Sequence, residues 1–381
     1  MKVLKILMSI PLDRRNFYKL GVKTYLDFFD KIQIFHIDEG YYFEKNKIFI
    51  HKKIEIIKIN YFYQLIKFLK IRKGSIYLDC TLPGLKTTII KTILHLKKDK
   101  IISFRLGILP KLKKPERSYS ILTAIKFLKY SYLAIFQLIE NKFLIKRRIN
   151  LCAGRKSENE YKKFNVIKAH SWDFDETLKI KKKNIRKKNF FLYLDQWAHG
   201  HPDYDYFKFS KVDPKIFYVS LNNFFDKLEK KFKTKVIIAA HPRANKYSYF
   251  KNKKSYFQNR QIYFNKTLEL SQKCFATISH DTTAISYSVI YKKPIIFILN
   301  DEMVRVKKNR KQEISVFSKE LGCSLINIDK DNYSFNNKNF FKINVKKYDN
   351  YFVNYIQNDK KNKKTIDKII CDIYSKDLLI K

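Results

Sequence analysis

The stretch Lys235-Val-Ile-Ile-Ala-Ala-His-Pro-Arg243 decides the fold of this chain. An apolar run of this length, ended by a His-Pro pair, is typical of a buried strand in a parallel sheet. A second run, Ala276–Ile278, leads into Ser279-His-Asp-Thr-Thr-Ala284, and a third lies at Ile295–Leu299. Helical patterns separate the runs, and strands that alternate with helices predict an α/β domain with a parallel sheet.

The same alternation extends over the rest of the chain. In the N-terminal half, strands are predicted at Lys2–Ser9, Lys31–Ile37, Ser75–Asp79, Ile101–Leu109, Asn150–Gly154 and Val166–Ala169, with helices at Asn16–Phe29, Tyr61–Ile71, Leu85–Leu96 and Ser120–Asn141. In the C-terminal half, further strands are predicted at Phe190–Leu194, Val236–Ala240 and Ser324–Ile328, with helices at Pro214–Phe232, Leu268–Cys274, Thr282–Ile290, Val304–Leu321 and within Lys346–Ile380.

Two such halves predict two Rossmann-like domains that face each other across a cleft. The domains are expected at residues 1–180 and 189–340, joined by the polar, cationic linker Lys179–Lys188. Residues 341–381 are expected to form a helical tail that packs back on the domains.

Two familiar phosphate-binding fingerprints are missing from the sequence. No G-x-G-x-x-G follows the first strand and no Walker A motif occurs, which excludes the usual dinucleotide and P-loop sites. In open α/β sheets, ligands bind beyond the carboxyl ends of the strands. His241 and Ser279 both follow predicted strands, so these two positions carry the functional prediction.

Composition limits the classes of partner and compartment. The 381 residues carry a net charge of +45 and are 45% hydrophobic, which indicates a folded chain that is attracted to anionic membranes and polyanions. The basic residues are spread along the chain and no nucleic-acid-binding module is recognisable, so specific nucleic-acid binding is not expected. Five isolated Cys without CxxC spacing argue against disulfides and zinc. No apolar run is long enough to span a bilayer. We expect a cytoplasmic protein whose contact with the inner membrane is at most peripheral.

The two strand ends have the chemistry of an anion site. His241 can donate a hydrogen bond to a phosphate oxygen or protonate a leaving group, Pro242 fixes the turn, and Arg243 adds a bidentate anion partner. The alternative for His241 is an ordinary turn residue. The cluster Ser279, His280, Thr282 and Thr283 places donors where a helix begins, and helix starts bind phosphate. Its alternative is N-capping, which is compatible with phosphate binding.

Carboxylates and aromatic residues elsewhere complete the list of candidates. Glu269 can accept hydrogen bonds from ribose hydroxyls, or it is a solvated residue on a helix face. Asp195 or Asp203 can act as general base on an acceptor hydroxyl. The alternative, a metal bound by His199, His201, Asp203 and Asp205, is disfavoured because all four lie in one loop. Candidates for the acceptor side are Trp197, His170, Asp173 and Asp175, although the last three could instead form a turn with an Asp cap.

The order of these motifs resembles a known family. A strand with His-Pro, then Glu269, then a Ser/Thr pair before a helix, then Lys292-Lys-Pro294 is similar to the GT-B bacterial sialyltransferases and related nonulosonic-acid transferases. The resemblance covers roughly residues 190–300. It implies a GT-B fold and a CMP-sugar donor. His241 would contact the donor phosphate and assist departure of CMP, Ser279 with Thr282 or Thr283 would bind the same phosphate, and Glu269 would bind the ribose. The family's acidic-acidic-Gly motif is absent, and Asp195 and Asp203 are the nearest replacements for its base.

The sequence therefore predicts a metal-independent glycosyltransferase of lipopolysaccharide or capsule biosynthesis that needs no cofactor. It would move a sialic-acid-like sugar from a CMP-linked donor onto a glycan or lipid-linked glycan, at the anionic inner-membrane surface. The N-terminal domain would take the acceptor and the C-terminal domain the donor. Two alternatives stay open: a Kdo or polyol-phosphate transferase of the same architecture, and a non-enzymatic cationic binder of polyanions or nucleic acid.

Overall fold

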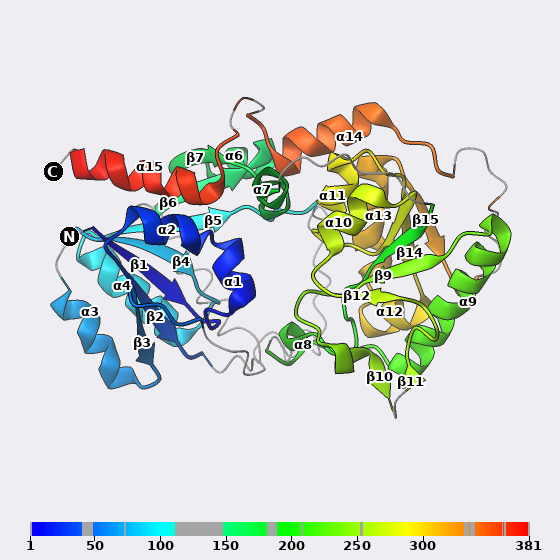
Figure 1. Ribbon diagram of the computed structural model, residues 1–381, viewed down its shortest axis with the longest axis horizontal. Helices are drawn as coiled ribbons and strands as arrows, with labels where there is room; N and C mark the ends of the chain where they lie inside the picture. Colours follow the sequence, from blue (N-terminus) through cyan, green and yellow to red (C-terminus); the bar gives the residue numbers. More distant parts are fainter. Residues whose placement is uncertain are drawn as a thin grey trace, which may run out of the picture. The chain divides into compact units, whose positions relative to one another are not determined.

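The computed structural model describes most of the chain (Figure 1). The described residues are 2–39, 49–71, 74–110, 148–180, 189–206, 209–251, 254–330, 335, 340–359, 361 and 363–379. The predicted helix Ser120–Asn141 and most of the predicted linker Lys179–Lys188 lie outside these residues.

The chain divides into two compact units. Unit 1 comprises Met1–Ile108, Glu116–Leu178 and Gln357–Lys381, and unit 2 comprises Leu109–Pro115 and Lys179–Ile356. The C-terminal segment therefore belongs partly to each unit, because α14 (Val345–Tyr351) lies in unit 2 and α15 (Ile366–Leu379) in unit 1.

Unit 1 contains a seven-stranded parallel sheet in the order β3-β2-β1-β4-β5-β6-β7. Its strands are β1 (Val3–Met8), β2 (Lys31–Ile37), β3 (Ile54–Ile59), β4 (Ile76–Cys80), β5 (Lys100–Arg105), β6 (Arg148–Ala153) and β7 (Asn165–Ala169). The strand order reverses direction between β1 and β4, and this pair forms the switch point of the sheet.

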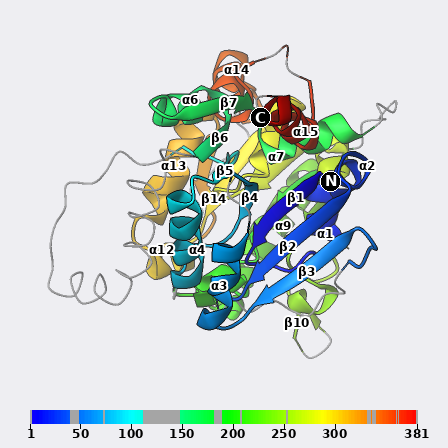
Figure 2. The same ribbon diagram turned by 90° about the vertical axis from the view of Figure 1, so that its left-hand side faces the viewer.

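Helices cover both faces of the unit 1 sheet, because neighbouring residues of a strand point to opposite faces. Ile6 of β1 packs in one core with residues of α2 and α15, while Leu7 packs in a second core with Leu65 and Phe68. Figure 2 shows α3 and α4 side by side over this second face. The helices are α1 (Arg14–Lys19), α2 (Val22–Phe28), the 3₁₀ turn η1 (Phe62–Leu65), α3 (Ile66–Lys70), α4 (Leu85–Leu96), α6 (Gly154–Tyr161) and α7 (Trp172–Lys179).

Unit 2 contains a six-stranded parallel sheet in the order β12-β9-β8-β13-β14-β15. Its strands are β8 (Phe191–Leu194), β9 (Val236–Ala239), β12 (Ile262–Tyr263), β13 (Ala276–Ser279), β14 (Ile295–Leu299) and β15 (Ser324–Asn327), and β10 (Phe250–Lys251) with β11 (Lys254–Ser255) forms a separate hairpin. The helices are α8 (Pro202–Tyr206), α9 (Pro214–Phe232), η3 (Lys246–Tyr249), α10 (Thr267–Lys273), α11 (Ile285–Ile290), α12 (Asp301–Val306), α13 (Arg310–Leu321), α14 and the π-helical turn η4 (Phe352–Ile356).

The two parallel sheets confirm the predicted pair of Rossmann-like domains. Several element predictions were wrong in detail. The predicted helix Asn16–Phe29 is two helices, because Gly21 adopts a φ of 69° between α1 and α2. The predicted helix Val304–Leu321 is also two, α12 and α13. Strand β3 and helix α6 were missed, the latter because its residues are polar and show no apolar period.

No helix among the described residues is long and apolar enough to cross a membrane.

Candidate active site

The switch point of unit 2 lies between β8 and β13, where the strand order reverses. Ser279 pairs in register with Leu194, so the loops that follow these two strands begin side by side. Strand β9 lies on the other side of β8 and ends immediately before Ala240 and His241. Three of the predicted site segments therefore start at one edge of one sheet.

Asp195 is the first residue after β8, and its side chain is buried. Its Oδ2 accepts hydrogen bonds from the Tyr249 hydroxyl at 2.7 Å and from the Trp197 backbone N–H at 2.9 Å. Its Oδ1 is also buried and has no hydrogen-bond partner among the described residues. Burial raises the pKa of Asp195 to about 6, and the two hydrogen bonds offset only part of the rise.

Tyr249 connects Asp195 to His241. The Tyr249 hydroxyl donates to Asp195 and accepts from the His241 backbone N–H at 3.0 Å. The tyrosine ring is buried, and η3 places it between the ends of β8 and β9. Asp195 thus fixes the start of the His241 loop through a side chain that the sequence pattern did not single out.

The backbone at Trp197 is strained. Its φ of 50° lies in the left-handed region, which is unusual for a bulky side chain and costs free energy. The hydrogen bond from its N–H to Asp195 helps to hold this conformation. A Cβ on Gly200 would lie 2.5 Å from the Trp197 indole nitrogen, so only glycine fits there. Trp197 is held by its own loop, and its predicted contact with an acceptor stays a prediction.

His201 and His241 form a ring pair at this edge of the sheet. Their ring centroids are 4.5 Å apart at an angle of 75°. In each ring Nδ1 accepts a backbone N–H from two residues on, Asp203 to His201 at 3.1 Å and Arg243 to His241 at 3.2 Å. An accepting Nδ1 places the proton of a neutral imidazole on Nε2. His201 Nδ1 also lies 3.6 Å from Asp203 Oδ2, so this carboxylate belongs to the same group of residues.

Asp203 and Arg243 join the same group of residues. The Arg243 Nη1 donates to Asp203 Oδ1 at 2.9 Å, which links the loop after β8 to the loop after β9. The Asp203 side chain is 43% exposed, whereas Asp195 is 6% exposed. Of the two predicted bases, only Asp203 is therefore within reach of a ligand from solvent.

The loop after β13 divides its residues between the interior and the surface. Ser279 is fully buried, and its hydroxyl has no hydrogen-bond partner among the described residues. His280 is also fully buried, and its nitrogens lie 2.7 Å from the Ile298 carbonyl and 3.0 Å from the Tyr193 hydroxyl. Burial lowers the pKa of His280 to about 3, so this ring is neutral. We therefore assign His280 to the interior, against its prediction as a donor contact.

The helix predicted from Thr282 begins only at Ile285 and has six residues. Thr283 is exposed and Thr282 half-buried, both in the turn that precedes α11. A helix this short has a weak dipole, so the predicted phosphate site loses part of its expected support.

A cation beside this loop was missed by the sequence analysis. Arg310, the first residue of α13, makes two hydrogen bonds or ion pairs to the Asp281 carboxylate, at 2.6 and 2.8 Å. It also donates to Gln196 Oε1 at 2.9 Å, while the Gln196 amide donates to the Asp281 carbonyl at 2.7 Å. This cluster ties the loops after β8 and β13 together.

Other predicted site residues of unit 2 make contacts with neighbouring groups of the same unit. Glu269 is exposed on α10 and pairs with Lys273 four residues on, at 2.5 Å, and its contact with ribose stays a prediction. His199 lies 2.8 Å from the Tyr218 hydroxyl and 3.0 Å from the Ser248 carbonyl, which occupies both of its nitrogens. Asp205 pairs with Lys211 at 2.7 Å. These contacts leave the metal alternative without a geometric basis, and no cluster of metal ligands occurs among the described residues.

Two of the residues predicted for the acceptor side, His170 and Asp175 of unit 1, contact the C-terminal segment, and their role at an acceptor stays a prediction. His170 Nε2 lies 2.9 Å from the Lys364 carbonyl, and Asp175 accepts the Ile366 N–H at 2.7 Å where α15 begins. Both side chains are fully buried. The alternative given above for this residue, an Asp that caps a helix, therefore fits Asp175. The helix that it caps is α15. Asp173 lies in the first turn of α7 and stays an untested candidate.

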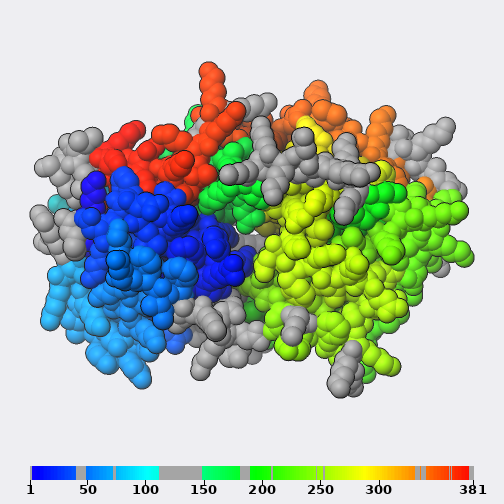
Figure 3. Space-filling view, in the orientation of Figure 1, coloured from blue at the N-terminus to red at the C-terminus, as the bar shows by residue number. Residues whose placement is uncertain are grey.

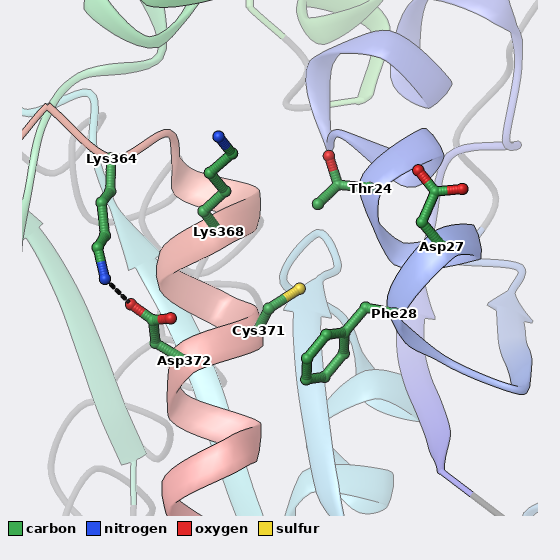
Figure 4. A pocket seen from close by; sticks show the side chains of 7 residues that line it. All are labelled: Thr24, Asp27, Phe28, Lys364, Lys368, Cys371 and Asp372. Carbon is green, nitrogen blue, oxygen red and sulfur yellow. Dashed lines mark hydrogen bonds and ion pairs between the residues drawn. The ribbon is translucent and has the colours of Figure 1, made fainter.

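A pocket of about 390 Å³ lies in unit 1 between α2 and α15 (Figure 4). Phe28, Lys368 and Cys371 are among its lining residues, and the Lys364 ammonium pairs with Asp372 at 2.6 Å. None of the predicted site residues lines this pocket.

Comparisons with known proteins support the fold. No protein-family model matches the chain, and no curated protein sequence matches it. Among solved structures, the wall teichoic acid polymerase TagF is 11% identical with a TM-score of 0.53, covering 98% of this chain and 89% of that chain. UDP-GlcNAc 2-epimerase from Methanocaldococcus jannaschii is 12% identical with a TM-score of 0.48, covering 98% and 99%. S. aureus MnaA in a co-structure with UDP is 12% identical with a TM-score of 0.42, covering 84% and 88%. The likeness to TagF shows a fold of the GT-B type.

Proposed function

We propose that this chain is a glycosyltransferase of the GT-B class that takes a nucleotide-activated sugar at the β8–β13 switch point of unit 2. The observation that carries the proposal is the convergence of His201, His241, Arg243 and Asp203 there: two imidazole rings with centroids 4.5 Å apart lie beside a guanidinium that pairs with a carboxylate at 2.9 Å. Such a set binds phosphate and leaves a base within reach of a hydroxyl group.

The donor we propose is a CMP-linked nonulosonic acid, and the acceptor is a glycan or lipid-linked glycan at the cell surface. This finer assignment rests on the order of the His-Pro, Ser/Thr and Lys-Lys-Pro motifs. We propose the cytoplasm, at the face of the inner membrane, as the place of reaction, because the net charge of +45 favours an anionic surface.

The proposed reaction is a displacement at the anomeric carbon. The acceptor hydroxyl gives its proton to Asp203 as its oxygen bonds to the anomeric carbon, and the bond from that carbon to the phosphate oxygen breaks. CMP leaves with the electron pair, and His241 and Arg243 stabilise the charge on its phosphate. Asp195, which is buried, positions Tyr249 and the His241 loop.

A second candidate, a polyol-phosphate transferase, is favoured by the likeness to TagF, for which structures of a variant soaked with CDPG (CDP-glycerol) are known. Such an enzyme would use the same phosphate-binding residues and break the phosphoanhydride bond of its donor. Both candidates release CMP and differ in the donor that they accept, so the donor must be tested directly.

The deciding experiment measures thermal stabilisation by CMP, CDP, UDP and CDP-glycerol, followed by product analysis with CMP-sialic acid and CDP-glycerol as donors. A ligand that binds only the folded chain raises the melting temperature. We expect stabilisation by CMP and transfer from the CMP-sugar. Transfer from CDP-glycerol alone would establish the second candidate. Absence of stabilisation by every nucleotide would overturn the proposal.

The matched control is His241→Ala, which should remove most turnover and keep the melting temperature, because the residue is only half-buried and its backbone N–H, which Tyr249 accepts, is retained. Salt-dependent binding of polyanions that is unchanged in this variant, with no transfer by the wild type, would instead support the non-enzymatic alternative.

A further inference from the structure

One segment of unit 1 exposes an unusual amount of apolar surface. The residues from Tyr61 to Lys70 form η1 and α3, and five large side chains within this segment are more than half exposed. Their exposed fractions are Tyr61 61%, Phe62 52%, Tyr63 69%, Ile66 54% and Leu69 59%. We call these five side chains and the lysines between them the 61–70 surface; Figure 3 shows this part of unit 1 in light blue.

The segment folds because its other face is buried. Leu65 and Phe68 pack in the core beside Phe35, and the Lys97 ammonium donates to the Phe68 carbonyl at 2.6 Å. At the other end, the Lys86 ammonium donates to the Asn60 carbonyl at 2.7 Å. These contacts fix the orientation of the segment, so the exposure of the five side chains is a property of the folded unit.

The neighbouring helix also exposes apolar side chains, one at each end. Helix α4 packs beside α3, and its residues Leu85 and Leu96 are 44% and 74% exposed. Single exposed apolar residues are ordinary, whereas a contiguous group of them marks an interaction site.

The charge of the 61–70 surface selects the partner. Lys67 and Lys70 are exposed within the segment, and the sequence from Asn60 to Lys73 contains no acidic residue. Tyrosine and phenylalanine with interspersed lysine is the composition that lies at the boundary between headgroups and acyl chains of an anionic bilayer. A protein partner would need acidic residues around an apolar hollow. An anionic bilayer instead presents negative headgroups and apolar acyl chains to any convex surface.

We propose that the 61–70 surface is a membrane-docking site that inserts Tyr63, Ile66 and Leu69 into the interface of a bilayer with anionic headgroups. This proposal deepens the proposed function. It rests on that function only for its purpose, because docking would give the enzyme access to a lipid-linked acceptor. Lysines attract the chain to the surface, and the apolar side chains add binding that salt does not screen.

The test is sedimentation of the full chain with phosphatidylcholine vesicles that contain about 30% phosphatidylglycerol. At low salt the net charge of +45 binds every variant, so the measurement is made at about 0.5 M salt, where the Debye length is about 4 Å. The test variant is Tyr63→Ser with Leu69→Gln. The matched control is Ile216→Ser with Val219→Ser on α9 in unit 2, whose side chains are 52% and 59% exposed.

We expect the test variant to bind at least about tenfold more weakly than the wild type, and the control to bind within about twofold, with unchanged melting temperatures. Equal binding of the test variant and the wild type would overturn the proposal. So would failure of the wild type to bind, or a self-association through this surface that Tyr63→Ser abolishes without any effect on vesicle binding. Because no donor is present, these outcomes are independent of whether the transfer reaction is assigned correctly.

Discussion

The two Rossmann-like units each bury an aspartate at the switch point of the sheet, and the two aspartates are compensated differently. In unit 1, burial of Asp79 on β4 is outweighed by Lys91, 3.0 Å away, and by Arg148, and its pKa is lowered to about 2. In unit 2, Asp195 accepts hydrogen bonds and has no ion pair with a described residue, and burial raises its pKa to about 6. The aspartate at the switch point thus lies on the second strand of the switch pair in unit 1, where it is part of an ion pair, and after the first strand of the pair in unit 2, where hydrogen bonds hold it.

This difference separates a stabilising role from a functional one. A buried ion pair is tolerated because each charge satisfies the other. A buried carboxylate with one unpartnered oxygen costs free energy, and such costs concentrate where a loop must be held in a particular conformation. The strained Trp197 and the Tyr249 contact to His241 are the features that Asp195 holds in place.

The largest expected effect distinguishes Asp203 from Asp195 as the base of the proposed reaction. Asp203→Asn removes the proposed base and should lower kcat by about 10²–10⁴-fold, the usual contribution of general base catalysis. Asp195→Asn keeps an oxygen that accepts from Tyr249 and Trp197, and kcat should stay within about tenfold. Steady-state kinetics of the two variants check this. The reverse order would move proton transfer to Asp195.

The next effect is on the stability of unit 1. Asp79→Ala leaves the Lys91 ammonium buried without its carboxylate and should lower the free energy of unfolding by about 3–5 kcal/mol. Urea unfolding measures the loss. The double variant Asp79→Leu with Lys91→Met removes both charges and should recover most of it; an equal loss in the double variant would show that packing, and not the charge, is responsible.

Asp195 and Asp79 also predict opposite dependences of the free energy of unfolding on pH. The folded pKa of Asp195 lies above the ordinary value of 3.8, so its ionisation destabilises the fold as pH rises from about 4 to 6, by up to about 3 kcal/mol. The folded pKa of Asp79 lies below 3.8, so its contribution of about 2 kcal/mol is present above pH 4 and lost toward pH 2. The free energy of unfolding, measured at a series of pH values, should decrease between pH 4 and 6 in the wild type. In Asp195→Asn only, this decrease should be absent.

The smallest expected effect tests the connection between the β8 and β9 loops. Tyr249→Phe removes the hydroxyl that donates to Asp195, so the pKa of Asp195 should rise further above about 6. Turnover should fall by about tenfold because the His241 N–H loses its acceptor. The free energy of unfolding as a function of pH distinguishes positioning from simple destabilisation. The decrease that accompanies ionisation of Asp195 should move to higher pH. An unchanged profile would disconnect Tyr249 from Asp195.

Much of the architecture was predictable, because buried parallel strands are continuous apolar runs. The runs before Asp195, His241 and Ser279 end in polar residues, and the parallel arrangement brings those ends to one edge of a sheet. This is why the position of the candidate site followed from the sequence.

The partners of these residues were not predictable, since they come from distant loops without a periodic pattern. Tyr249 lies 54 residues from Asp195, and Arg310 lies 114 residues from Gln196. The same separation explains why the sequence did not reveal the contacts of His170 and Asp175, whose partners Lys364 and Ile366 follow 194 and 191 residues later. Polar residues at a strand end look alike in sequence whether they bind a ligand or a returning segment.

The return of α15 to unit 1 has a consequence for synthesis of the chain. Ile369, Ile370 and Tyr374 belong to the same core as Ile6 and Leu78, so that core is incomplete until residues 366–374 have left the ribosome. Residues 189–356 of unit 2 are translated earlier and contain its whole sheet. The unit that is translated first is therefore the last whose core can be completed.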